Sequence, residues 1–236
     1  MKFSRNFTNI FNWILDNLIP PFIRDSKFFI YPLFWLVFKN KATFFMEFKE
    51  KMFFLTKAQI IEYYKNLSDV HIDRKTDLNK ESVNFIMNNI VGNTVLDIAC
   101  GRGYLANKIV EKLDYKVIGI DFIIPDKLKN SVNPTFLEGN IENIPFPDRH
   151  FETVICTHTL EHVLDIQRGL DELRRVCKKK LIIVLPKQRE YKYTFDLHVH
   201  FFPYKYSVLN LMKNNKGECF CLNNDWVYYE KIGNLS

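Results

Sequence analysis

Short runs of β-branched residues alternate with stretches of helical periodicity from residue 83 onward, and this alternation constrains the fold more than any other feature of the chain. It is typical of stacked strand–helix–strand units, which build a parallel sheet with helices on both faces. Strands are expected at 94–99, 116–120, 135–138, 153–157, 181–185, 218–222 and 226–230. Only turn-forming residues separate the last two, which predicts an antiparallel hairpin. The pattern therefore predicts an α/β fold with a doubly wound, seven-stranded, mostly parallel sheet.

Helical periodicity dominates the first third of the chain, where strand-like runs are missing from the sequence. Helices are expected there at 12–18, 32–39, 44–54 and 56–66. Within the α/β region they are expected at 104–113, 126–130, 166–177 and 206–212. We therefore predict two domains, a helical and aromatic-rich N-terminal extension over residues 1–82 and the α/β domain over residues 83–236.

The first 80 residues are basic and rich in aromatic side chains. They hold 13 Lys and Arg against 8 Asp and Glu, and 13 of the 22 Phe of the chain. A helical cap with its own aromatic core accounts for this composition, and so does a surface for a membrane, a nucleic acid or an anionic substrate. Residues 1–54 thus offer a peripheral membrane contact. The longest apolar stretch, 28–38, is about half the length that a bilayer-spanning helix requires.

Cysteine usage and the N-terminal residues favour a cytoplasmic location. Five cysteines, an odd number, are scattered over the chain, which favours reduced thiols over a disulfide framework. Asn and Asp side chains interrupt the apolar run after Lys2 and Arg5, so a secretory signal is not expected.

A glycine loop follows the first expected strand, in the segment 97–103. Gly101 and Gly103 let the backbone turn sharply and approach a ligand, and the helix that follows offers free N–H groups to a carboxylate. Asp97 supplies a carboxylate suited to an ammonium group. A phosphate-binding loop would need Lys followed by Ser or Thr after its glycines, and these are missing. Ala106 at the third small position keeps a dinucleotide-binding loop open as an alternative.

Further motifs follow at the ends of later strands. Asp121 stands 20 residues after Gly101, where a carboxylate accepts hydrogen bonds from ribose hydroxyls. Gly139-Asn140, with Ile144-Pro145-Phe146, comes next, and the fourth strand ends near Leu160-Glu161-His162. Together with the glycine loop, these motifs resemble the class I S-adenosylmethionine-dependent methyltransferases, particularly those that act on small molecules.

The resemblance implies S-adenosylmethionine as cofactor and S-adenosylhomocysteine as product. Asp97 and the glycine loop would hold the methionine part, Asp121 the ribose and Phe122 one face of the adenine. The cofactor-binding residues implied are Asp97, Ala99, Cys100, Gly101, Gly103, Asp121, Phe122, Asn140, Ile141 and Thr157. Ala99 stands where the family has Gly, which an added methyl group would change little, and Asn140 stands where the family has Asp.

Histidines near the strand ends are candidates for a general base, because a near-neutral pKa suits proton removal from an alcohol. The candidates are His158, His198 and His200, and a structural role for each is the alternative. As a string, His158-x-x-Glu161-His162 matches the inverted zinc-protease motif. It also approaches the Glu-x-x-Glu-His of quinone-pathway O-methyltransferases that bind a divalent cation. His158 replaces the first Glu of that motif, so a metal is not expected.

The acceptor is expected to be a small molecule. Methyltransferases for amines of nucleic-acid bases place Asn/Asp-Pro-Pro-Tyr/Phe after the fourth strand, whereas this chain has Cys-Thr-His-Thr over 156–159, so a nucleic acid is not expected. Segments such as Tyr31-Pro32-Leu33-Phe34 and 194–198 resemble methyltransferases associated with polysaccharide and cell-envelope biosynthesis. That resemblance implies O-methylation of a sugar. A lipid or quinone acceptor, or a non-catalytic methyltransferase-like protein, are the alternatives, and the oligomeric state is not predicted.

Overall fold

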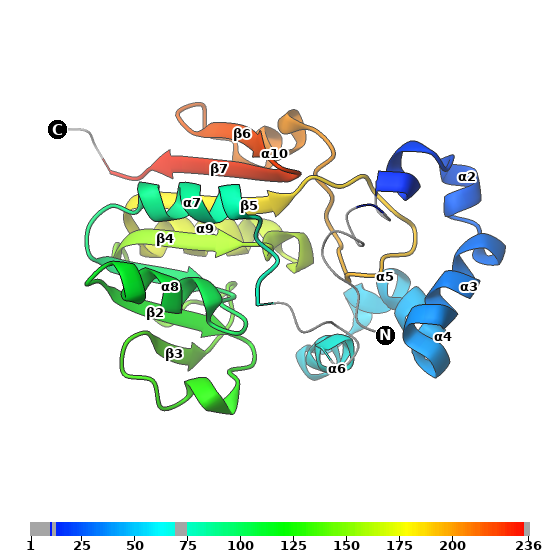
Figure 1. Ribbon diagram of the computed structural model, residues 1–236, viewed down its shortest axis with the longest axis horizontal. Helices are drawn as coiled ribbons and strands as arrows, with labels where there is room; N and C mark the ends of the chain where they lie inside the picture. Colours follow the sequence, from blue (N-terminus) through cyan, green and yellow to red (C-terminus); the bar gives the residue numbers. More distant parts are fainter. Residues whose placement is uncertain (1–9, 11–12, 69–74, 234–236) are drawn as a thin grey trace. The chain divides into compact units, whose positions relative to one another are not determined.

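The computed structural model describes residues 10, 13–68 and 75–233, and within them seven strands form one sheet in the order β3-β2-β1-β4-β5-β7-β6 (Figure 1). The strands are β1 (Thr94–Ile98), β2 (Lys116–Asp121), β3 (Thr135–Glu138), β4 (Phe151–Thr157), β5 (Cys177–Pro186), β6 (Glu218–Leu222) and β7 (Asp225–Lys231). Strands β1 to β5 are parallel, and β7 is antiparallel to both of its neighbours. The predicted seven-stranded, mostly parallel sheet is confirmed. Its strand order switches between β1 and β4, which places a ligand site beyond the carboxyl ends of those strands.

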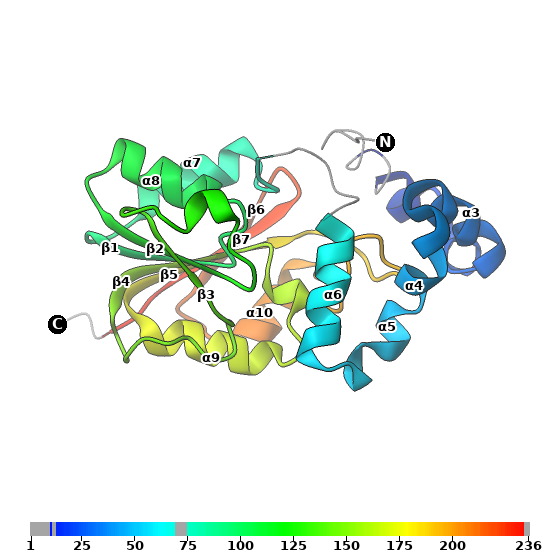
Figure 2. The same cartoon turned by 90° about the horizontal axis from the view of Figure 1, so that it is seen from below.

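Helices cover both faces of this sheet (Figure 2). They are α7 (Lys80–Asn89) and α8 (Tyr104–Lys112) on one face, with α9 (Ile166–Val176) and α10 (Lys205–Met212) on the other. Each face buries its own apolar cluster, with Ile86 and Ile109 in one and Leu170 and Met212 in the other. The near-continuous apolar strands of the sequence are explained by this burial on both faces.

The hairpin between β6 and β7 closes the sheet with a turn of two residues. Asn223 and Asn224 have φ values of 44° and 67°, so both lie in the left-handed region. A two-residue turn of this kind matches the right-handed twist of paired strands, and Asn tolerates it better than most residues. Asp225, expected in the turn, is instead the first residue of β7.

The chain divides into two compact units, and the division differs from the expected boundary at residue 82. One unit comprises Met1–Arg74 with Gln188–Phe201, and the other comprises Lys75–Lys187 with Phe202–Ser236. The sheet unit begins before residue 83 because Asn79, the N-cap residue of α7, is bound to that helix and so belongs to the same unit.

Segment 188–201 belongs to the helical unit because helical residues bind its backbone. Arg24 donates to the carbonyl of Glu190 at 2.7 Å, and Lys49 donates to the carbonyl of Tyr191 at 2.8 Å. Both cations therefore hold this segment in place. These hydrogen bonds join residues far apart in the chain, so a local sequence pattern does not predict them.

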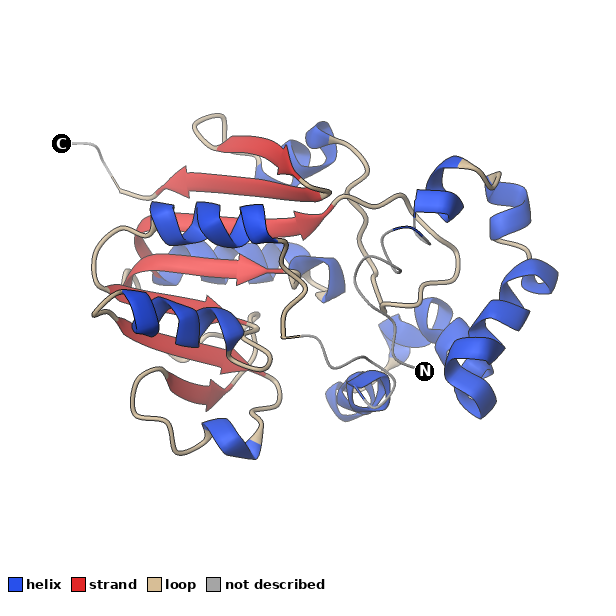
Figure 3. Ribbon diagram, in the orientation of Figure 1, coloured by secondary structure: helices blue, strands red, loops and turns tan. Residues whose placement is uncertain are grey.

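Residues 13–68 are helical and contain no strand (Figure 3). Residues 13–17 form one helical turn, and residue 12 lies outside the described residues. The helices that follow are α2 (Pro21–Arg24), α3 (Lys27–Phe38), α4 (Ala42–Met46), α5 (Phe48–Lys51) and α6 (Lys57–Ser68), with 3-10 turns at Lys39–Lys41 and Met52–Phe54. The helix expected over 44–54 is therefore broken into several short pieces. Among the described residues, no helix has the length and apolar character needed to cross a membrane.

Helix α3 begins five residues before the expected start at Pro32, which lies inside it. Proline removes one helical hydrogen bond but has a helical φ. Phe34 and Phe38 are buried on one face of α3, where Phe34 lies 4.2 Å from the Phe195 ring and Phe38 stacks 4.1 Å from the Phe45 ring. This aromatic packing stabilises the helix despite the missing bond, and it gives the unit a core of its own.

Candidate functional site

The glycine loop after β1 has an unusual backbone, because three of its residues have positive φ. The φ values of Ala99, Gly101 and Gly103 are 56°, 53° and 73°. The loop is held by the Cys100 N–H, which donates to the carbonyl of Ile120 at 3.0 Å. Ala99 therefore costs about 1–2 kcal/mol of strain relative to an allowed conformation, so its extra methyl group is less neutral than the sequence alone indicated.

Gly101 and Gly103 serve different purposes. A Cβ atom on Gly101 would meet nothing within 4 Å, so this stretch of backbone faces open space that a ligand can enter. A Cβ on Gly103 would lie 2.7 Å from the Phe136 ring on β3. Gly101 thus leaves room for a ligand, and Gly103 leaves room for the core.

We expect Gly103→Ala to lower the free energy of unfolding by about 2–4 kcal/mol, because left-handed strain adds to overpacking against Phe136. Gly101→Ala is the matched control, with strain alone and a cost of about 1–2 kcal/mol. Urea unfolding monitored by circular dichroism measures both. Adding Phe136→Leu should restore part of the free energy of unfolding that Gly103→Ala loses, and none of what Gly101→Ala loses. Equal costs for the two glycine variants would contradict the distinction.

Two carboxylates lie at the ends of neighbouring strands β1 and β2. Asp121 accepts from the N–H of Gly101 at 2.8 Å and from the N–H of Ile123 at 3.3 Å, and burial raises its pKa. Asp97 is buried, and its Oδ2 atom has no hydrogen-bond partner within the described part of the chain. The pKa of Asp97 is raised to about 7, mainly by burial and to a smaller extent by the nearby charge of Asp121, against a lowering contribution from the backbone of Ala106.

An unsatisfied buried carboxylate oxygen costs free energy unless a ligand supplies a donor. The oxygen of Asp97 suits an ammonium group, and open backbone lies beside it in sequence at Gly101. These features fit the methionine end of S-adenosylmethionine. The donor set at this place is therefore compatible with the cofactor that the motifs imply.

The remaining expected cofactor residues differ in how available they are. Phe122, directly after Asp121, is 42% exposed, so part of its side chain is accessible. Ile141 is buried in the core. Asn140 stabilises its own turn, because its side-chain oxygen accepts from the N–H of Glu142 at 3.0 Å. The hydroxyl of Thr159 donates to the carbonyl of Thr157 at 2.9 Å, so that backbone oxygen already has one partner.

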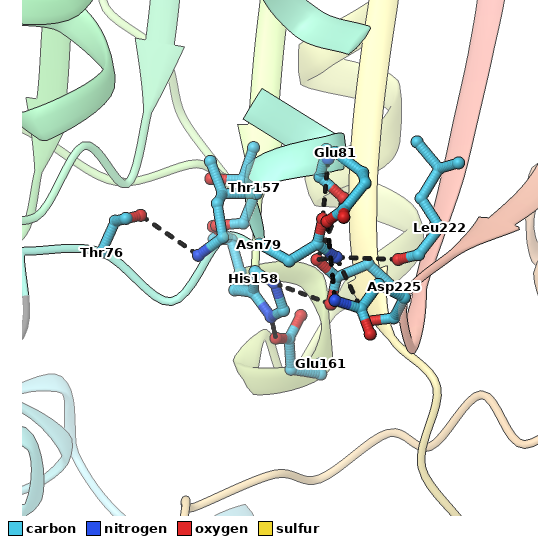
Figure 4. A network of polar contacts seen from close by, with 12 residues as sticks. Thr76, Asn79, Glu81, Thr157, His158, Glu161, Leu222 and Asp225 are labelled. Atoms are coloured by element: carbon cyan, nitrogen blue, oxygen red, sulfur yellow. Dashed lines mark hydrogen bonds and ion pairs between the residues drawn. The ribbon is translucent and has the colours of Figure 1, made fainter. Parts of the chain in front are cut away.

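His158 lies between two buried carboxylates at the end of β4 (Figure 4). Its Nε2 atom is 3.4 Å from Asp225 Oδ1, and its Nδ1 atom is 3.6 Å from Glu161 Oε1. Burial alone lowers the pKa of His158, but its contacts with Asp225 and Glu161 outweigh that effect and raise the pKa to about 10. The ring is an imidazolium at neutral pH and has no lone pair to accept a proton. His158 as general base is therefore disfavoured on physical grounds.

Asp225 connects this ion pair to the start of α7. Its Oδ2 atom accepts from Asn79 Nδ2 at 2.7 Å and from Ser82 Oγ at 3.1 Å, and Asn79 also accepts from the Ser82 N–H at 2.8 Å. The network therefore joins β4, β7 and α7 (Figure 4). Asn79 carries an N-cap signal in the sequence. Asp225 carries none, because its partners are distant in sequence.

The other two candidate histidines, His198 and His200, belong to segment 188–201 of the helical unit. The Nδ1 atom of His198 lies 2.6 Å from Gln188 Oε1, so Nδ1 donates and Nε2 is the basic nitrogen of the neutral ring. The backbone N–H of His198 donates to Thr194 Oγ1 at 3.3 Å. Gln188, which sequence reasoning missed, thus sets the tautomer of His198.

Known proteins resemble this chain both in sequence and in fold. Residues 96–185 match the family described as a methyltransferase domain. The 2-phytyl-1,4-naphtoquinone methyltransferase of Trichormus variabilis is 33% identical over 98 residues, which cover 37% of this chain and 43% of that protein. A solved structure of a SAM-dependent methyltransferase from Thermotoga maritima superposes with a TM-score of 0.51 and 16% identity, over 64% of this chain and 88% of that one. Residues 96–185 of this chain are therefore similar to a methyltransferase domain, on a fold that solved methyltransferase structures share.

The matched segment spans less than half the length of the curated relatives. Arginine-hydroxylase NDUFAF5 of Rattus norvegicus is 34% identical over 93 residues, which cover 38% of this chain and 27% of that protein. One relative is named a methyltransferase and the other a hydroxylase, yet both match this chain over a segment of similar length. The sequence match therefore identifies the type of domain and does not identify the reaction.

Proposed function

We propose that the chain transfers the methyl group of S-adenosylmethionine to a small acceptor of lipid or quinone type. The observation that carries this proposal is the arrangement at the ends of β1 and β2. The ends of these strands combine an open glycine backbone at Gly101, a carboxylate at Asp121 that suits ribose hydroxyls, and a buried carboxylate oxygen at Asp97 without a partner among the described residues.

The named quinone relative supports the acceptor class. The relative's printed name refers to a naphthoquinone with a phytyl chain, an apolar acceptor. This likeness favours an apolar acceptor over the sugar that the sequence resemblance implied.

The residues of the chain would bind and orient the two reactants. The cofactor supplies an activated sulfonium methyl group. Asp97 would hold its ammonium group and Asp121 its ribose hydroxyls, and the exposed ring of Phe122 would cover the adenine. Orientation of the acceptor in line with the methyl group supplies much of the rate enhancement in such a reaction. A proton leaves the acceptor, and His198 and His200 stay the candidates that the sequence offers for its removal.

We expect His198→Ala to lower kcat about 10²-fold while leaving the affinity for S-adenosylmethionine unchanged. Gln188→Leu should have a smaller effect and shift the pH–rate profile, because it removes the acceptor that fixes Nδ1–H. Turnover with a tritiated methyl donor over pH 6–9 measures both. His150→Ala, at an exposed histidine of the other unit, is the control. Wild-type rates in His198→Ala would remove His198 from this role.

Two measurements test the function itself. Calorimetry of the purified chain with S-adenosylmethionine should show binding at a single site, and a lack of binding would contradict the proposal. Tritiated donor incubated with a total lipid extract and, separately, with the aqueous extract identifies the acceptor class. Label that enters only the organic phase supports a lipid or quinone, and label that stays in the aqueous phase supports a sugar. Binding of the donor with no transfer to either extract would indicate a non-catalytic protein.

A further inference from the structure

Helix α3 is apolar around its whole circumference, and packing within its own unit covers one side. Ile30, Phe34 and Phe38 are buried and recur at intervals of four residues, so they form one face. The rings of Phe34 and Phe38 pack against Phe195 of segment 188–201. This face belongs to the aromatic core of the unit and is buried, so it is not accessible to a partner.

A second side of α3, next to the buried face, is apolar and exposed. Phe28 is 95% exposed and Trp35 is 53% exposed, and these two residues are seven positions apart, on one side of the helix. Tyr31 and Leu36 flank them and are also exposed. A large side chain contributes about 1.5–3 kcal/mol when it leaves water, so a row of this kind is typical of a binding surface.

All charged residues within α3 and in the short segment after it are positive, and Asp25 is the acidic residue that precedes the helix. The segment 27–46 contains Lys27, Lys39 and Lys41 and no acidic residue. Lys39 lies at the C-terminal end of the face, with its Nζ atom 5.8 Å from the centroid of the Trp35 ring. An aromatic and apolar stripe with cations at its ends complements acyl chains beneath anionic headgroups.

The length of α3 decides how it can meet a bilayer. Its 12 residues span about 18 Å, well short of the roughly 30 Å of a hydrocarbon core. A helix of this length lies in the plane of the interface and buries one face.

We propose that α3 binds the surface of an anionic membrane and inserts Phe28 and Trp35 among the lipids, with Lys27 and Lys39 at the headgroups. The sequence predicted a membrane contact somewhere in residues 1–54, and this proposal places it on one side of α3. It brings the whole enzyme to a membrane whatever the methyl acceptor is, because binding at α3 requires neither the cofactor nor the acceptor.

Vesicle flotation of the full chain, without methyl donor, tests the proposal. The chain should float with vesicles of phosphatidylcholine and phosphatidylglycerol, and much less with phosphatidylcholine alone. The double variant Phe28→Ser/Trp35→Ser should lower the partition coefficient at least about tenfold. Lys27→Gln should lower it about fivefold on the anionic vesicles only. Val132→Ser is the matched control, because Val132 is 90% exposed on the sheet unit.

If this side of α3 binds a second copy of the chain instead of a membrane, the experiments give different results. Sedimentation velocity without vesicles detects a second copy of the chain. A dimer that the double variant dissociates, together with no flotation of the wild type, would overturn the membrane proposal in favour of self-association. Flotation that is unchanged in the double variant would also overturn it, since the chain would then bind lipid elsewhere. Circular dichroism of each variant confirms that the helices remain folded.

Discussion

Asp97→Asn should stabilise the ligand-free chain and at the same time weaken its binding of S-adenosylmethionine about 10²–10³-fold. The carboxylate of Asp97 is buried, one of its oxygens has no hydrogen-bond partner among the described residues, and burial raises its pKa to about 7. Ionising this group in the folded chain without a ligand is therefore unfavourable. An amide of the same shape does not carry that cost, but it cannot pair with an ammonium group.

The effect on stability depends on pH in a way that identifies the group. The pKa of Asp97 rises from the ordinary 3.8 to about 7 on folding. Its contribution to stability is therefore fully present below about pH 4 and is lost as the pH rises through 7. We expect Asp97→Asn to match the wild type near pH 4 and to exceed it by on the order of 4 kcal/mol at pH 8.

Chemical denaturation at several pH values and calorimetry with the cofactor measure the two halves of this prediction. Asp114→Asn, at an exposed carboxylate of the same unit, is the control and should change neither quantity. A variant that loses stability at pH 8, or one that binds the cofactor as the wild type does, would show that Asp97 is a structural group.

The sequence predicted the sheet well because its signal is local. Each strand is a short β-branched run buried on both faces, and each intervening helix has its own apolar stripe, so no long-range information was needed. The largest error in the helical unit, the start of α3, arose at Pro32. There tertiary burial of Phe34 and Phe38 outweighed a local helix-breaking preference.

The parts of the site that consist of short continuous sequence motifs could be predicted from the sequence. The glycine loop and Asp121 are linked by the hydrogen bond from Gly101, which joins two motifs that the sequence had already paired by spacing. His158 shows where this reasoning stops. The sequence offered it as a base, and what disfavours that role is Asp225, which approaches only because β7 lies beside β5 in the sheet.

The network around His158 leads to the second large prediction, that His158→Ala lowers the free energy of unfolding by about 3–5 kcal/mol. Both Glu161 and Asp225 are buried, and His158 is the cation between them. Removing one member of a buried ion pair leaves an uncompensated charge, which costs far more than the contact contributes. His150→Ala, at an exposed histidine of the same unit, should cost less than about 0.5 kcal/mol.

The pH dependence distinguishes lost charge pairing from a simple cavity. The pKa of His158 is about 10 in the folded chain, against an ordinary value of 6.5. Its stabilising contribution is therefore fully present below about pH 6.5 and is lost as the pH rises through 10. The wild type should lose on the order of 4 kcal/mol over that range relative to His158→Ala, so that the two stabilities converge at high pH. A constant difference between them from pH 6.5 to 10 would mean that His158 acts by packing alone. Because an imidazolium cannot accept a proton, the fraction of His158→Ala that remains folded should keep turnover within a few-fold of the wild type at neutral pH.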